Sequence, residues 1–150
     1  MNTTCTRKLE FDAAHRVLGH GGKCKNLHGH RYVAEVSATA SNLNDLDMVI
    51  DFSVLKSVVG GWVDQYWDHN IILNSKDPLL MCGPEAFSGG SGGYKVPFVM
   101  PEGLNPTAET LAQFLFDKAT KLLDDKGVAV THIRLYETPN CWADYPVQSV

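Results

Sequence analysis

Two stretches near the amino end alternate between apolar and polar residues, the period of a half-buried strand. Residues 5–15 carry apolar side chains on one face, which ends in His15, and charged side chains on the other. Residues 28–39 alternate in the same way, with His28 and His30 leading the apolar face. A glycine-rich loop joins the two stretches, so we expect an antiparallel pair.

Two further stretches have helical spacing. From Asp51, which we expect to be an N-cap, apolar residues recur every three or four positions as far as Tyr66. Asn105 is expected to cap the second helix, with Pro106 in its first turn and an apolar stripe that runs to Leu123.

The remaining segments complete the expected fold. Residues 128–137 alternate again and predict a strand. Residues 83–93 are rich in glycine and serine and predict a loop, and an edge strand is expected near 95–99 because proline cannot donate to a central ladder. The order of elements predicts one α+β domain over residues 1–150, with an antiparallel four-stranded sheet and two helices packed on one face.

Composition and charge narrow the classes of function. A hydrophobic fraction of 44% and a charged fraction of 20% are typical of a globular protein, and no apolar run approaches a membrane span. The net charge of −4 gives no support to nucleic-acid or membrane-surface binding. The amino end lacks the features of a secretory signal, so we expect a cytoplasmic protein.

Three histidines are candidates for a metal centre. Positions i and i+2 of a strand point to the same side, so His28 and His30 can converge on one ion. His15 can supply a third nitrogen from the paired strand, and three histidines with one open position are the composition of a catalytic zinc site. For His20 and His132 we prefer a solvated or hydrogen-bonded side chain.

Cys24, four positions before His28, has two interpretations. It can close the metal shell and make the site structural, or it can be a reactive thiol. Structural zinc sites usually carry two or more thiolates, and the flanking Lys23 and Lys25 favour a thiolate. The residues alone leave both interpretations open and lean towards the reactive thiol.

Polar residues elsewhere have weaker signals. Asp68 precedes His69 at the expected end of the first helix, where a carboxylate can orient an imidazole, although a surface pair explains the pattern equally well. Glu137 lies on the apolar parity of its strand, which indicates either a strand end or a buried anchor for a guanidine-like ligand edge. Helix initiation is a sufficient explanation for Thr107 and Glu109.

Six segments in this order resemble one family over nearly the whole chain: FDAAHR (11–16), CKNLHGHRY (24–32), VIDFSVLK (49–56), WDHNIILN (67–74), NPTAET (105–110) and YETPN (136–140). The chain resembles the 6-pyruvoyltetrahydropterin and 6-carboxytetrahydropterin synthases. The resemblance implies the tunnelling fold, in which trimers close a barrel and stack as hexamers, with pockets at subunit boundaries. Residues 75–103 are longer than in the shortest members and are expected to be an insertion.

The resemblance also implies roles for the candidate residues. The zinc ligands would be His15, His28 and His30. The thiol of Cys24 would transfer protons together with the relay pair Asp68 and His69, and Glu137 would anchor the pterin ring. Thr107 and Glu109 would contact the pterin pocket, and Arg16 or a nearby lysine would meet the triphosphate of the substrate.

The gap of three residues between Cys24 and His28 resembles the carboxy-forming branch of the family, whose product enters the queuosine pathway. That branch converts 7,8-dihydroneopterin triphosphate to 6-carboxytetrahydropterin and releases triphosphate and acetaldehyde. The alternatives are the pyruvoyl-forming reaction, a different zinc enzyme such as a hydratase, and a zinc-stabilised pterin- or nucleotide-binding module without turnover.

Overall fold

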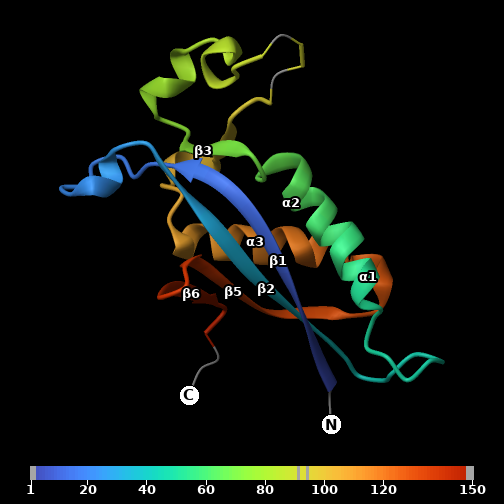
Figure 1. The fold of residues 1–150 in the computed structure, drawn as a ribbon. Helices are drawn as coiled ribbons and strands as arrows, with labels where there is room; N and C mark the ends of the chain where they lie inside the picture. The colour runs from blue at the N-terminus through green and yellow to red at the C-terminus, as the bar shows by residue number, and fades with distance from the viewer. Residues whose placement is uncertain (1–2, 91, 94, 148–150) are drawn as a thin grey trace.

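A computed structural model describes residues 3–90, 92–93 and 95–147. These residues form a curled, mixed sheet of six strands in the order β4-β3-β1-β2-β5-β6 (Figure 1). The strands are β1 (Thr3–His15), β2 (His28–Ala40), β3 (Asn70–Asn74), β4 (Phe98–Met100), β5 (Ala129–Thr138) and β6 (Cys141–Tyr145).

The prediction of an antiparallel four-stranded sheet is wrong in strand number and direction. The strands expected at 5–15, 28–39 and 128–137 are present, and the expected edge strand is β4. The sequence pattern missed β3, which pairs in parallel with β1 and β4. Four of the five residues of β3 are buried, so they show no alternation that would distinguish a strand. It also missed β6, a short and largely half-exposed strand.

The first helical stretch consists of α1 (Phe52–Leu55), a π-helical turn (Lys56–Gly60) and α2 (Gly61–Tyr66). Its expected cap is confirmed, because the carboxylate of Asp51 accepts a hydrogen bond from the Ser53 amide at 2.7 Å. A Cβ atom at Gly60 would lie 3.1 Å from Cδ2 of Leu9. The absence of a side chain therefore lets this stretch approach β1 closely.

The second helix, α3 (Ala108–Leu122), begins later than expected. Thr107 is its N-cap and forms a capping box with Thr110, so the assignment of the cap to Asn105 is wrong. Asn105 instead bridges to the chain after β1, because its side chain accepts from the Leu18 amide and donates to the Leu18 carbonyl, both at 3.0 Å.

Both helical stretches cover the same face of the sheet, as expected, and share one apolar core with it. Phe11 of β1 stacks on Tyr32 of β2 with ring centroids 5.0 Å apart, and Trp67 lies against Phe11 at 5.5 Å. Among the described residues, no helix is long and apolar enough to cross a membrane.

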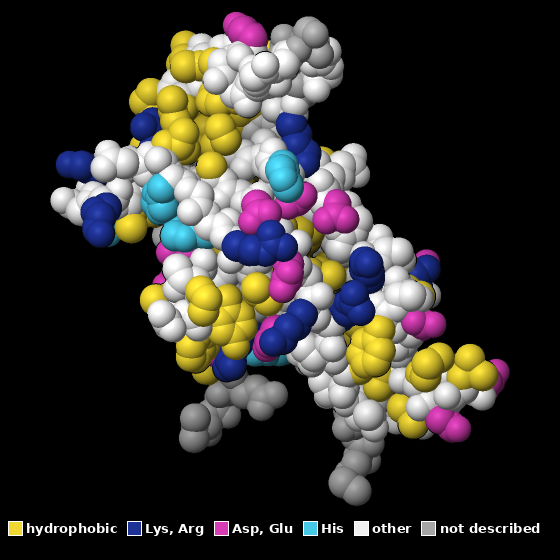
Figure 2. All heavy atoms as spheres, in the orientation of Figure 1, with side chains coloured by type: hydrophobic (Ala, Val, Ile, Leu, Met, Phe, Trp, Pro, Cys, Tyr) yellow, Lys and Arg dark blue, Asp and Glu magenta, His cyan; other side chains and the backbone are white. Residues whose placement is uncertain are grey.

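The other face of β1 and β2 carries charged side chains. Lys8 pairs with Glu35 at 3.3 Å, and Arg31 pairs with Asp12 at 2.9 Å and with Glu10 at 3.3 Å. Figure 2 shows basic and acidic side chains next to one another across the middle of the visible face. The sheet therefore has one apolar face and one face that is balanced in charge.

The segment expected to be a loop at 83–93 contains a short 3-10 turn at Pro84–Phe87, and a second one precedes it at Pro78–Met81. Apolar side chains gather on this part of the surface (Figure 2), and Met81 is 90% exposed. Residues 91 and 94 of the expected loop and strand region lie outside the described residues.

Candidate active site

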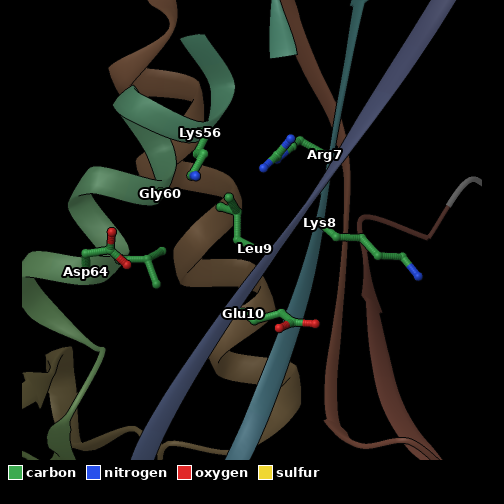
Figure 3. Close-up of a pocket in the computed structure, with 8 residues that line it drawn as sticks. Arg7, Lys8, Leu9, Glu10, Lys56, Gly60 and Asp64 are labelled. Carbon is green, nitrogen blue, oxygen red and sulfur yellow. The ribbon is translucent and has the colours of Figure 1, made fainter. Parts of the chain in front are cut away.

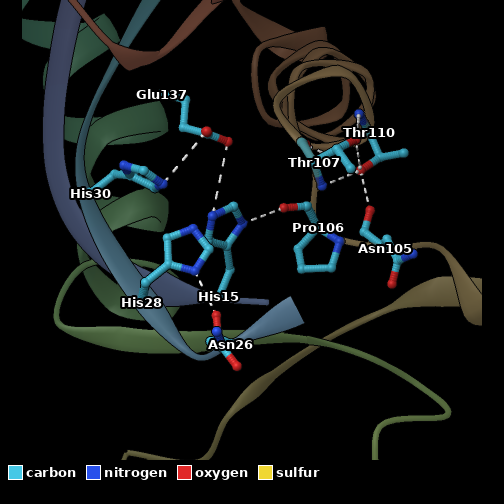
Figure 4. A network of polar contacts seen from close by, with 9 residues as sticks. All are labelled: His15, Asn26, His28, His30, Asn105, Pro106, Thr107, Thr110 and Glu137. Carbon is cyan, nitrogen blue, oxygen red and sulfur yellow. Dashed lines mark hydrogen bonds and ion pairs between the residues drawn. The ribbon is translucent and has the colours of Figure 1, made fainter. Parts of the chain in front are cut away.

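The register of β1 and β2 brings three histidines together. His15 lies directly opposite His28, and His30 lies opposite Ala13, so all three side chains project from the same face. One ligand atom of each imidazole lies within 4.8 Å of the other two (Figure 4). The structure therefore places His15, His28 and His30 as the sequence predicted, in a group that can hold one metal ion.

Two backbone carbonyls orient these rings. The Pro106 carbonyl accepts from Nδ1 of His15 and the Asn26 carbonyl from Nδ1 of His28, both at 2.6 Å (Figure 4). A carbonyl only accepts, so each Nδ1 carries a proton, and in the neutral ring Nε2 then keeps its lone pair. This arrangement is typical of metal-binding histidines, whose second nitrogen donates to an outer partner.

The Nε2 atoms of His15 and His30 are buried and have no hydrogen-bond partner among the described residues. Burial lowers the pKa of both imidazoles, although the charge of Glu137 opposes the shift. Neutral imidazoles are the form that binds metals. Ring nitrogens of His15 and His30 that are buried without a hydrogen-bond partner fit a divalent cation such as zinc.

Glu137 lies beside this cluster. Its carboxylate oxygens are 3.5 Å from Nε2 of His30 and 3.9 Å from Nε2 of His15, and its side chain is 26% exposed. Glu137 lies on the same face of β5 as the buried Ile133 and Leu135. The prediction that it shares the apolar face of its strand is therefore correct. The carboxylate is thus partly buried and still reachable from solvent.

A cavity of about 260 Å³ opens beside His15, and His28 and His30 do not line it. It brings together the following predicted site residues: His15, Cys24, Thr107, Glu109 and Glu137. His20, Cys141 and Trp142 also line it, and no motif distinguished these three in the sequence. The half-buried Cys24 carries a free thiol, as expected for a residue with no disulfide partner.

Asp68 and His69 form a pair at 2.7 Å between Oδ2 and Nδ1, but they lie elsewhere. They follow α2, and the Asp12 backbone holds them, because its amide donates to Asp68 at 2.9 Å and its carbonyl accepts from the His69 amide at 2.7 Å. His69 adopts a left-handed φ of 51° and lines a separate cavity with Asp12, Ala14 and Gly29. Asp12 and Ala14 alternate with the buried Ala13 and His15, so this cavity is on the opposite side of β1 from Cys24.

The charge on Asp68 holds the imidazole of His69 in one orientation. Partial burial opposes ionisation of Asp68, but the hydrogen bonds from Asp12 and His69 and the charge of Lys95 together leave its pKa lowered. Lys95 donates to the backbone carbonyls of Asp64 and Asp68, which attaches the 75–103 segment to the end of α2. Asp68 is therefore an anion that fixes the ring of His69.

Arg16 does not line the cavity at Cys24. Its guanidinium forms a bidentate pair with Asp77, with Nε to Oδ2 at 2.7 Å, and the Asp77 side chain is fully buried. Asp77 also accepts from the Leu79 amide at 2.8 Å. Arg16 thus anchors the start of the 75–103 segment, and its predicted contact with a triphosphate stays a prediction.

Two structural supports of the site, both backbone carbonyls, were not predicted. The carbonyls of Pro106 and Asn26 have no sequence signal, because every residue carries a carbonyl. Gly29 lies between the two histidines of β2, and a Cβ there would be 3.3 Å from the Ala13 carbonyl oxygen. A glycine at this position keeps β1 and β2 close where the histidines meet.

Comparison with known proteins identifies relatives over nearly the full length. Residues 4–148 match the family model described as 6-pyruvoyl tetrahydropterin synthase. A 6-carboxy-5,6,7,8-tetrahydropterin synthase from Rickettsia bellii is 43% identical over 141 residues, which cover 93% of this chain and 97% of the relative. The enzyme of the same name from Aquifex aeolicus is 33% identical, with 97% of this chain and 98% of the relative covered.

A solved structure supports the fold. The 6-pyruvoyl tetrahydropterin synthase of Plasmodium falciparum superposes with a TM-score of 0.70 at 21% identity and covers 95% of this chain and 96% of its own. The curled mixed sheet with two helices is therefore the fold of that protein as well.

The Arg16–Asp77 pair generates a prediction about stability. The guanidinium lowers the pKa of Asp77, so the pair stabilises the fold above the pKa of an unfolded aspartate and loses its effect as pH falls through the lowered value. Asp77→Asn should lower the free energy of unfolding at pH 7 by about 2 kcal/mol. Urea unfolding at several pH values measures the difference, which should shrink below about pH 4.

Asparagine keeps the shape of the side chain and can still accept from the Leu79 amide, so the variant isolates the charge. Asp125→Asn is the matched control, because Asp125 is exposed and pairs only with Lys126 in the described chain. A loss for Asp77→Asn that does not vary between pH 7 and pH 3 would contradict the account.

Proposed function

Because the chain belongs to the 6-pyruvoyl tetrahydropterin synthase family, we propose that it is a zinc-dependent lyase that forms 6-carboxytetrahydropterin. The substrate would be 7,8-dihydroneopterin triphosphate, and triphosphate and acetaldehyde would be released. The observation that carries the proposal is the cluster of His15, His28 and His30, of which His15 lines a cavity that also holds Cys24 and Glu137.

Two features favour the carboxy-forming reaction over the pyruvoyl-forming one. The relatives at 43% and 33% identity are both named 6-carboxy-5,6,7,8-tetrahydropterin synthase. The gap of three residues between Cys24 and His28 agrees with that branch. A role in queuosine synthesis and a cytoplasmic location follow from the same proposal.

The residues of the cavity would divide the chemistry between them. Zinc held by the three imidazoles would supply a Lewis acid that polarises oxygens of the substrate side chain. Glu137 would anchor the pterin by accepting two hydrogen bonds from its amino and ring N–H groups. Cys24 would act as a thiolate that moves a proton at the substrate side chain. Thr107 and Glu109 would line the pterin pocket.

The pair Asp68 and His69 would be the second proton-transfer group. Within one chain it lies across β1 from Cys24, and the two groups line different cavities. We therefore propose that the complete site forms between copies, with Cys24 from one copy and His69 from its neighbour. The expected trimer, stacked as a hexamer, would provide this arrangement.

The strand edges support such an assembly. β1 pairs with β3 only at Ala13–His15, so no described strand pairs with the remaining ten residues of that edge. β6 forms the opposite edge of the sheet. Unpaired edges favour pairing with another chain, and a ring of copies would satisfy both edges at once. The role of residues 75–103 as an insertion in a single domain stays a prediction.

Product analysis tests the function. The zinc-loaded protein incubated with 7,8-dihydroneopterin triphosphate should release acetaldehyde and triphosphate, and a chelator should abolish the release. Cys24→Ala should retain zinc but lose turnover by about two to four orders of magnitude, the range for a general acid or base. Metal content and acetaldehyde are measured on the same samples.

Cys82→Ala is the control, since Cys82 is exposed and does not line the cavity. Release of triphosphate without acetaldehyde would identify the pyruvoyl-forming reaction and reject the proposed product. Loss of zinc from Cys24→Ala would show that the thiol is a ligand.

Mixing variants tests the shared site. Cys24→Ala and His69→Ala should each be inactive alone. Co-expressed in equal amounts, they should recover about a quarter of wild-type turnover, because a neighbouring pair in a random trimer has both intact groups in one case of four. Mixed assemblies are verified by native mass spectrometry. Mixed oligomers that stay inactive would show that each chain uses its own Cys24 and His69.

A further inference from the structure

A second cavity lies between β1 and the first helical stretch, at the part of β1 that has no strand neighbour. Its volume is about 270 Å³ (Figure 3), and it shares no residue with the cavity at Cys24. The lining residues are Arg7, Lys8, Leu9, Glu10, Lys56, Gly60, Val63 and Asp64. No role in the proposed reaction uses any of them.

Two cations converge on this cavity. Figure 3 shows that the guanidinium of Arg7 and the ammonium of Lys56 point into the same gap beside Leu9. Nε of Arg7 is buried and has no hydrogen-bond partner among the described residues. Within the described chain, neither Arg7 nor Lys56 has an ion pair with a carboxylate within 4.0 Å.

The neighbouring carboxylates do not neutralise these charges. Glu10 pairs with Arg31 on the other face of the sheet, at 3.3 Å, and Figure 3 shows it directed away from the gap. Asp64 lies at the helical side of the cavity (Figure 3) and forms no ion pair with either cation. By contrast, Arg16, Arg31 and Arg134 all pair with carboxylates.

A buried donor without a partner is costly, and the exposed Lys56 adds a second positive charge beside it, so the gap favours an anion. The planar guanidinium can donate two parallel hydrogen bonds to an oxyanion, and the ammonium adds a point charge with three donors. Gly60 and Leu9 line the cavity between the helix and the strand.

We propose that the cavity between β1 and the first helical stretch binds a phosphate group through Arg7 and Lys56. The site is separate from the candidate active site and does not depend on the proposed reaction. Its position at the unpaired part of β1 means that a neighbouring copy paired there would lie over the bound ion.

Calorimetric titration of the full-length protein with inorganic phosphate tests the site. Ionic strength is kept constant with chloride, so that a general charge effect does not appear as binding. Arg7→Gln and Lys56→Gln should each weaken phosphate binding at the cavity by about tenfold or more, the loss expected for a charge-assisted hydrogen bond. Circular dichroism confirms that each variant is folded.

Lys121→Gln is the matched control, because Lys121 is an exposed lysine on α3 that does not line this cavity and its change removes the same charge. It should bind phosphate as the wild type does. Cys24→Ala should also keep this binding, which separates the site from the active-site proposal. No phosphate binding by the wild type, or binding that survives both Arg7→Gln and Lys56→Gln, would overturn the proposal.

Discussion

The antiparallel pairing of β1 with β2 determines which side chains can meet in this protein. A register with His15 opposite His28 and His30 opposite Ala13 places three imidazoles on one face. A shift of one residue would turn His28 and His30 to the charged face and move Tyr32 out of the core. The same pairing therefore determines both the apolar core and the candidate metal centre.

The connection from α2 to β3 determines where Asp68 and His69 lie. β3 enters the sheet parallel to β1, and the turn before it binds the Asp12 backbone on the charged face. Asp68 and His69 are consequently held in place on the other face of β1 from the cavity that Cys24 lines. One chain thus holds two separate groups of candidate residues, and the proposed assembly is what would bring them together.

The elements that could be predicted are those whose own residues show a regular pattern of apolar and polar positions. Alternation located β1, β2 and β5 and the parity of Glu137, and helical spacing located both helical stretches. β3 was missed because a strand buried on both faces does not alternate. The carbonyl of Pro106 was missed because every residue carries a backbone carbonyl, so the sequence does not mark this one. The position of His69 was missed because it depends on the connection from α2 to β3 rather than on neighbouring residues.

The central claim is that the metal belongs to the three histidines and leaves the thiol of Cys24 free. Zinc K-edge X-ray absorption of the wild-type protein tests it directly, because zinc binds imidazole nitrogen at about 2.0–2.1 Å and thiolate sulfur at about 2.3 Å. The account predicts a first shell of nitrogen and oxygen atoms without sulfur. A sulfur atom at about 2.3 Å in the substrate-free protein would contradict it.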